Sequence, residues 1–165
     1  MKKKTGPVVS IVIGSDSDLP VMKETVSILE EFAVPHEVYL TSAHRAPERT
    51  TAYAKKAASR GVRIIIAGAG AAAHLAGVIA SHTSIPVIGV PIDSSSLKGL
   101  DALLSTVQMP GGVPVATMAI GKAGARNAGL FAVRILALND DSLRKKLAGY
   151  HRRMARSIEE KQKTL

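Results

Sequence analysis

Residues 8–18, VVSIVIGSDSD, give the clearest indication of the fold of this chain. Five of the six residues 8–13 are apolar and β-branched, a run too continuous for a strand with one face in water. It predicts a buried central strand of a parallel sheet. Gly14 allows a tight turn after this strand, and a helix predicted from Leu19 would point unpaired N–H groups at the same place. We therefore expect a small anionic ligand to bind at this turn.

The length and bulk composition predict one globular domain, which the alternation of strands and helices described below makes an α/β domain. The chain has 165 residues, of which 46% are hydrophobic and 21% charged, so it can bury a full core. We expect a core over about 8–138 and a basic C-terminal helix over about 140–163. Cysteine is absent, which excludes disulfide and thiolate chemistry. The apolar run after the first lysines ends in Gly-Ser-Asp without a cleavage pattern, so we expect a cytoplasmic protein without a signal peptide.

The net charge of +9 is concentrated at the two ends of the sequence. Lysines occupy positions 2–4, and eight basic residues lie between Arg144 and Lys163. Such a cluster can bind nucleic acid or a membrane surface. The chain has only five aromatic residues, however, so no stacking platform accompanies the charge. We interpret the cluster as a solvated helix and expect no nucleic-acid or membrane partner, while salt-sensitive nucleic-acid binding stays open as the alternative.

Apolar runs and helical periodicities alternate along the chain. They predict strands at 8–13, 36–40, 62–67, 86–90 and 115–120, and helices at 19–32, 47–60, from the turn at 68–77 to about 82, 97–105, 124–137 and from a cap at Asp140 to the C-terminus. Such alternation is typical of a parallel sheet with helices on both faces. Ligands bind such sheets beyond the carboxyl ends of the strands. The loops after the first three strands, GSDSD, SAHR and GAGAAAH, should therefore converge.

Few residues in these loops suit catalysis. His44 follows the second strand, where an imidazole can act as general acid or base or can simply bond a backbone carbonyl. Arg45 offers a fork for phosphate or carboxylate, and His74 could bind substrate or cap the next helix. No spacing of histidines and carboxylates suits a metal, so we expect none. Gly68 stands where a phosphate-accepting receiver domain needs an aspartate, which argues against that class.

Five motifs together carry a family resemblance. They are GSDSD at 14–18, SAHRAPE at 42–48, AGAGAAAHLAG at 67–77, PVIGVP at 86–91 and VQMPGGVPVATMAIG at 107–121. In this order they resemble the N5-carboxyaminoimidazole ribonucleotide mutases of purine biosynthesis (the PurE family, class I type). The resemblance implies a flavodoxin-like three-layer fold with a five-stranded parallel sheet. It also implies a homo-octamer with active sites at subunit contacts, and neither metal nor organic cofactor.

The resemblance also implies a reaction and a set of site residues. These mutases move a carboxylate from the exocyclic N5 of the imidazole to ring carbon C4, through CO₂ that stays trapped in the site. His44 matches the general acid/base, which protonates the amine and later takes a proton from C4. The residues that match the substrate-binding positions are Ser15, Ser17 and Arg45 for phosphate, Asp18 for ribose, and Ser42, Gly70, Ala71, His74 and Leu75 around the imidazole and its carboxylate.

Two positions depart from the family pattern GAGGAAHLPG. Ala71 replaces the second paired glycine, and Ala76 replaces the proline. Ala71 adds a methyl group near the substrate and disfavours a positive φ, while Ala76 lacks the rigidity of proline. We predict that activity is kept. Two alternatives remain open, a direct aminoimidazole ribonucleotide carboxylase that uses CO₂ and a catalytically silent ribonucleotide-binding homologue. The SAHR sequence favours the mutase, because direct carboxylases read more like SAHKT.

Overall fold

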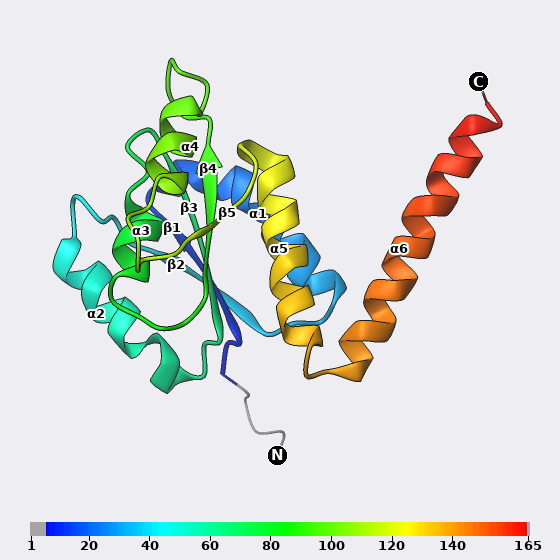
Figure 1. Cartoon of the computed structure of the whole chain (residues 1–165), viewed down its shortest axis with the longest axis horizontal. Coiled ribbons are helices and arrows are strands. Elements are labelled where there is room, and N and C mark those ends of the chain that lie inside the picture. Colours follow the sequence, from blue (N-terminus) through cyan, green and yellow to red (C-terminus); the bar gives the residue numbers. More distant parts are fainter. Residues whose placement is uncertain (1–5, 165) are drawn as a thin grey trace.

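A computed structural model describes residues 6–164 and contains one five-stranded sheet (Figure 1). The strands lie in the order β2-β1-β3-β4-β5, and every neighbouring pair is parallel. Their bounds are β1 Val9–Ile13, β2 His36–Leu40, β3 Ile64–Gly70, β4 Val87–Ile92 and β5 Ala116–Thr117. This order is the flavodoxin-like one, whose direction reverses between β1 and β3. The predicted fold class is confirmed.

Helices cover both faces of the sheet, as Figure 1 shows. One face carries α1 (Leu19–Glu31) and α5 (Gly121–Ala137), and the other carries α2 (Pro47–Ala57), α3 (Leu75–Ala80) and α4 (Leu100–Val107). Two short 3₁₀ turns, η1 (Asp16–Asp18) and η2 (Ala58–Arg60), precede α1 and follow α2. The last helix, α6 (Asp141–Gln162), starts beside α5 and then runs away from the body.

The alternation of side chains along β1 divides the core into two halves. Val9, Ile11 and Ile13 point toward α1 and α5, whereas Val12 points toward α2 and α3. All of these side chains are buried, because β1 has a strand on each side and a helical layer on each face. The continuous apolar run in the sequence is therefore explained by burial on both faces.

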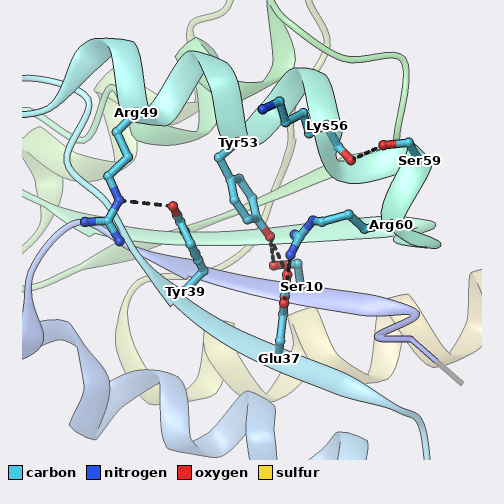
Figure 2. Close-up of polar contacts among 8 residues, drawn as sticks. All are labelled: Ser10, Glu37, Tyr39, Arg49, Tyr53, Lys56, Ser59 and Arg60. Carbon is cyan, nitrogen blue, oxygen red and sulfur yellow. Dashed lines mark hydrogen bonds and ion pairs between the residues drawn. The ribbon is translucent and has the colours of Figure 1, made fainter. Parts of the chain in front are cut away.

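Ser10 is the one polar residue of β1, and a hydrogen-bond network under α2 satisfies it (Figure 2). Its hydroxyl bonds that of Tyr53, which donates to Glu37 Oε1 at 2.8 Å. Arg60 donates to both oxygens of the same carboxylate, at 2.6 and 3.1 Å, and lies over the Tyr53 ring. Burial raises the pKa of Tyr53 to about 12. The network joins β1, β2, α2 and η2.

Helix α6 is capped as predicted and packs along only part of its length. The Asp140 carboxylate accepts hydrogen bonds from the N–H groups of Ser142 and Leu143, the N-cap geometry expected from the sequence. Leu143 and Tyr150 are buried against the body. Met154 and Ile158, further along the same helix, are 54% and 67% exposed. The outer part of α6 therefore presents apolar side chains to solvent.

Strands β3 and β4 are longer at their carboxyl ends than the sequence predicts. Ala69 and Gly70 still pair with Pro91 and Ile92, so residues expected in a turn belong to the sheet. Helix α3 accordingly starts at Leu75 and ends at Ala80. The extension places Ala69 and Gly70 at the carboxyl edge of the sheet, where the loops after β1 and β2 also lie.

Two other predicted elements also have different bounds. Helix α4 begins at Leu100 instead of residue 97, because Lys98 and Gly99 have φ values of +51° and +84°, which interrupt a right-handed helix. Strand β5 has two residues instead of six. After Met118 donates to the Gly89 carbonyl, the chain turns into α5, which starts at Gly121, one turn earlier than predicted.

None of the helices within residues 6–164 has the length and apolar character needed to cross a membrane. The basic residues at 2–4 lie outside the described residues, so the structure does not bear on that part of the charge pattern.

The network in Figure 2 predicts a pH-dependent contribution to stability. Burial alone would raise the pKa of Glu37, but the hydrogen bonds from Arg60 and Tyr53 outweigh it and lower that pKa. The ionised carboxylate therefore stabilises the fold above pH 4.5, its ordinary pKa, and this contribution is lost as the pH falls through the lower native value. Arg60 is partly in water, so we expect Glu37→Gln to lower the free energy of unfolding by about 1 kcal/mol at pH 7.

Urea unfolding of the wild type and Glu37→Gln between pH 3 and 7 measures this difference. We expect the difference in free energy of unfolding to decrease as the pH falls toward 3. Glu159→Gln, which changes an exposed carboxylate on α6, is the matched control and should leave stability nearly unchanged. A Glu37→Gln difference that stays constant over the whole range would contradict the assignment of the lowered pKa.

Candidate active site

A cavity of about 290 Å³ opens at the carboxyl edge of the sheet. The loops after β1, β2, β3 and β4 form its walls. The lining residues are Gly14, Ser15, Ser17, Asp18, Ser42, Ala43, His44, Arg45, Ala69, Gly70, Ala72, Leu75 and Ser94. The structure thus brings together all of the predicted site residues except Ala71 and His74, which lie beside the cavity without lining it.

The loop after β1 is held by its own side chains. The Ser15 N–H donates to Asp18 Oδ2 at 2.9 Å, and the Ser17 hydroxyl donates to the Ser15 hydroxyl at 2.9 Å. Asp18 precedes α1 as predicted, but its side chain makes no capping bond to that helix. The carboxylate turns back to the loop instead, where it completes the capping box of the 3₁₀ turn. The hydroxyl groups of Ser15 and Ser17 lie at the opening of the cavity.

Asp18 is a carboxylate with little access to water, since only 4% of the residue is exposed. Burial raises its pKa, although hydrogen bonds from the backbone at Ser15 and Gly14 and the charge of Arg45 act in the opposite direction. An ionised carboxylate that has lost part of its hydration gains from hydroxyl donors. Asp18 is therefore suited to bind the hydroxyl groups of a sugar.

Arg45 lines the cavity and connects two of its loops. Its guanidinium donates to the Gly14 carbonyl at 3.0 Å through Nη2 and to the Ser42 hydroxyl at 3.4 Å through Nε. The Arg45 backbone N–H also bonds the Ser42 hydroxyl, at 3.2 Å. These bonds join the loops after β1 and β2. Within residues 6–164 the other N–H donors of the fork have no protein partner, so they can bind an anion.

The wall after β3 is built from small residues against the loop after β4. A Cβ atom placed on Gly70 would lie 1.7 Å from the Ser94 hydroxyl, so only glycine fits there. Ser94 lines the cavity but is missing from the sequence-based prediction. The prediction considered only the loops after the first three strands. The hydroxyl-rich segment 94–96, directly after the fourth buried strand, is the signal that could have indicated it.

The two unusual alanines of this segment occupy different environments. Ala71 has a φ of +51°, so alanine adopts the left-handed conformation that the sequence analysis expected it to resist. For an L-residue this conformation costs about 1 kcal/mol. Ala76 is buried, 3% exposed, in the first turn of α3. The strain is therefore located at Ala71, next to Gly70 of the cavity wall.

His44 and His74 contact each other at the edge of the cavity. Nε2 of His44 lies 2.8 Å from Nδ1 of His74, and the two rings meet nearly at right angles, at 79°. His74 occupies the N-cap position of α3, but its side chain makes no capping bond. Of the two roles predicted for His74, capping is therefore wrong for its side chain.

The other histidines lie elsewhere. His36 Nδ1 is 2.9 Å from the Val34 carbonyl oxygen. His151 of α6 lies next to Arg134 of α5. Among residues 6–164, no group of three or more histidines, aspartates or glutamates has the arrangement needed to hold a metal ion.

Comparisons with known proteins show the family of this chain. A family model described as AIR carboxylase matches residues 8–157. This chain belongs to the AIR carboxylase family. It is 59% identical over 163 residues to an N5-carboxyaminoimidazole ribonucleotide mutase of Pyrococcus horikoshii, covering 99% of this chain and 91% of the relative. It is 54% identical over 159 residues to the mutase of Thermotoga maritima, covering 96% and 92%.

A solved structure supports the same assignment. The crystal structure of Treponema denticola PurE superimposes with a TM-score of 0.87, at 28% sequence identity, and covers 96% of this chain and 98% of that one. The family resemblance carried by the five sequence motifs is thereby confirmed.

The positive φ of Ala71 predicts that glycine stabilises the chain. We expect Ala71→Gly to raise the free energy of unfolding by about 0.5–1 kcal/mol, because the strain is relieved while the unfolded chain gains some entropy. Turnover should stay equal or rise. Chemical denaturation and steady-state kinetics on one preparation measure both quantities.

Ala33→Gly is the matched control. Ala33 has a φ of +57° and ends α1 in a Schellman motif, in which its N–H bonds the Glu30 carbonyl and that of Val34 bonds the Leu29 carbonyl. This variant should gain similar stability with no change in turnover. Lower turnover in Ala71→Gly would show that the methyl group is no burden to the site.

Proposed function

We propose that this chain is an N5-carboxyaminoimidazole ribonucleotide mutase. It converts the N5-carboxylated imidazole ribonucleotide to the 4-carboxy-5-aminoimidazole isomer in purine biosynthesis. The proposal rests above all on the 59% identity to the Pyrococcus horikoshii mutase across nearly the whole of both chains. The cavity that collects residues of the first three motifs is compatible with this function.

We assign parts of the cavity to parts of the ribonucleotide. Ser15, Ser17 and the Arg45 fork would bind the phosphate, because hydroxyl and guanidinium donors suit its oxygens. The buried carboxylate of Asp18 would accept hydrogen bonds from the ribose hydroxyls. Ser42, Gly70 and Leu75 would enclose the imidazole and its carboxylate. Ala71 and His74 would lie directly behind this wall. Ser94 joins this wall as a further contact.

His44 would carry the two proton transfers. When the N5 carbamate loses CO₂, the exocyclic nitrogen takes a proton from the imidazolium. C4 then bonds to the carbon of CO₂, and the C4 proton goes to the neutral imidazole, which restores the starting state. The reaction is proton-neutral overall, so one group that gives up a proton and takes one back is sufficient. None of these steps requires a metal or an organic cofactor.

The small-residue wall would keep CO₂ next to the ring. Ala69, Gly70 and Ala72 line the cavity beside Leu75 and present little to bind water. A site that excludes water limits the escape and hydration of a reactive intermediate. This feature favours transfer within one molecule over uptake of CO₂ from solution.

We also propose that the chain works as a homo-octamer in the cytoplasm, with residues 8–138 as the catalytic core. Leu97, Leu100, Leu104 and Val107 form an apolar stripe on and before α4, each about half exposed or more, and the outer part of α6 carries another. Contiguous exposed apolar patches of this kind commonly form interfaces. The charged phosphate of the substrate cannot readily cross a membrane, which places the enzyme where the substrate is made.

Sedimentation velocity tests the assembly. We expect a single species of eight chains, and Leu104→Glu should dissociate it, because the substitution places a charge inside an apolar interface. Glu30→Gln, which lies on α1 away from this stripe, is the control that should leave the mass unchanged. A monomeric wild type would contradict the octamer.

Turnover of N5-carboxyaminoimidazole ribonucleotide in labelled bicarbonate tests the function. We expect the wild type to form product without incorporating label, and His44→Asn to lose activity by at least about 10²-fold. His151→Asn, a change of the same type on α6, should keep full activity.

Other outcomes would support the alternatives. Label entering the product from unsubstituted aminoimidazole ribonucleotide at a comparable rate would indicate a direct carboxylase. Substrate binding without any conversion by the wild type would indicate a silent homologue.

A further inference from the structure

The contact between His44 and His74 leaves the two nitrogens of the His44 ring in different environments. Nε2 lies 2.8 Å from Nδ1 of His74, within hydrogen-bond distance. Within residues 6–164, Nδ1 of His44 makes no hydrogen bond to a protein group. Both rings are exposed and come from different loops, so the contact is made by the tertiary structure and not by local sequence.

A hydrogen bond between two neutral imidazoles fixes where the protons lie. One of the two facing nitrogens must carry a hydrogen and the other must accept it. If His44 donates from Nε2, its Nδ1 is an unprotonated base and His74 carries its hydrogen on Nε2. The bond then selects one tautomer of His44 and restricts the rotation of its ring.

We propose that His74 is a positioning residue for His44 in the mutase reaction, which rests on the function proposed above. His74 Nδ1 accepts a hydrogen bond from His44 Nε2 throughout the cycle, and His44 exchanges its catalytic proton at Nδ1. The Nδ1 proton goes to the exocyclic nitrogen as the bond from nitrogen to the carboxyl carbon breaks. The C4 proton returns to Nδ1 after the C4–carboxyl bond forms, so the proton count balances.

The backbone around both rings supports this role. His74 is fixed at the first turn of α3, where the Val78 N–H bonds the His74 carbonyl oxygen at 2.9 Å. His44 lies in the loop between β2 and α2, directly before Arg45, whose side chain bonds Ser42 and Gly14. A neutral partner behind the catalytic imidazole orients it as the carboxylate does in a serine hydrolase triad, and adds no negative charge next to a carboxylated substrate.

Two substitutions separate this role from direct substrate binding. Asn at position 74 places its side-chain oxygen close to the position of Nδ1, whereas Gln places its amide near that of Nε2. If His74 acts through Nδ1, His74→Asn should keep kcat within about threefold, and His74→Gln should lower kcat about 10- to 100-fold with little change in KM. His151→Asn and His151→Gln are the matched controls.

The opposite pattern would overturn the proposal. Retained activity in His74→Gln with a loss in His74→Asn, or a loss confined to KM, would mean that His74 binds substrate through Nε2. Equal, wild-type kcat in both variants would mean that the contact has no part in the reaction.

Carbethoxylation of the free protein tests the contact without turnover. Diethyl pyrocarbonate reacts with an unprotonated ring nitrogen and favours Nε2, and peptide mass mapping follows His44 alone. We expect His44 to react about fivefold faster in His74→Gln than in the wild type or His74→Asn. The loss of one hydrogen bond of ordinary net strength changes the population of the reactive form by about this factor. Equal rates in all three would overturn the pairing. A wild type that shows this protection but no mutase turnover would overturn the proposed function and leave the pairing supported.

Discussion

The parallel pairing of β1 on both of its edges is the constraint on which the rest of the structure depends. Ile13 at its end is in register with Leu40 of β2 and with Gly68 of β3. Three strands therefore end at one edge of the sheet, and their loops must meet there. Burial of the β1 side chains against helices on both faces maintains this register, since a shift by one residue would place Ser10 among apolar groups.

The polar network below α2 links this constraint to the loop after β2. Tyr53 of α2 bonds Ser10 of β1 and Glu37 of β2, so the helix is attached to the two strands whose ends carry the first two loops. The loop that holds His44 leads directly into α2. The same contacts that satisfy a buried hydroxyl therefore also fix where the segment 42–46 can lie.

The site combines rigid and unfavourable features. Gly70 allows the backbone to approach Ser94, Ala71 adopts a left-handed conformation, and Asp18 keeps a carboxylate out of water. The conformation of Ala71 and the burial of the Asp18 carboxylate cost stability locally, and the buried parallel sheet compensates for this cost. The result is one cavity that combines a wall of small residues with a poorly hydrated carboxylate. Isolated Ser, His and Arg side chains on a surface would not provide these conditions.

Local sequence patterns were sufficient to predict the sheet, the alternation of layers, the cap at Asp140 and the convergence of the first three loops. These follow from local patterns, namely continuous β-branched runs, helical periodicity and turn residues, which act over a few residues. Only the tertiary structure decided where β3 and β4 end, because Ala69 and Gly70 become strand by pairing with β4. The tertiary structure also placed Ser94 in the cavity wall and His74 against His44. Both contacts join segments that are far apart in the chain, and the pattern of residues within one segment does not indicate which distant segment will pack against it.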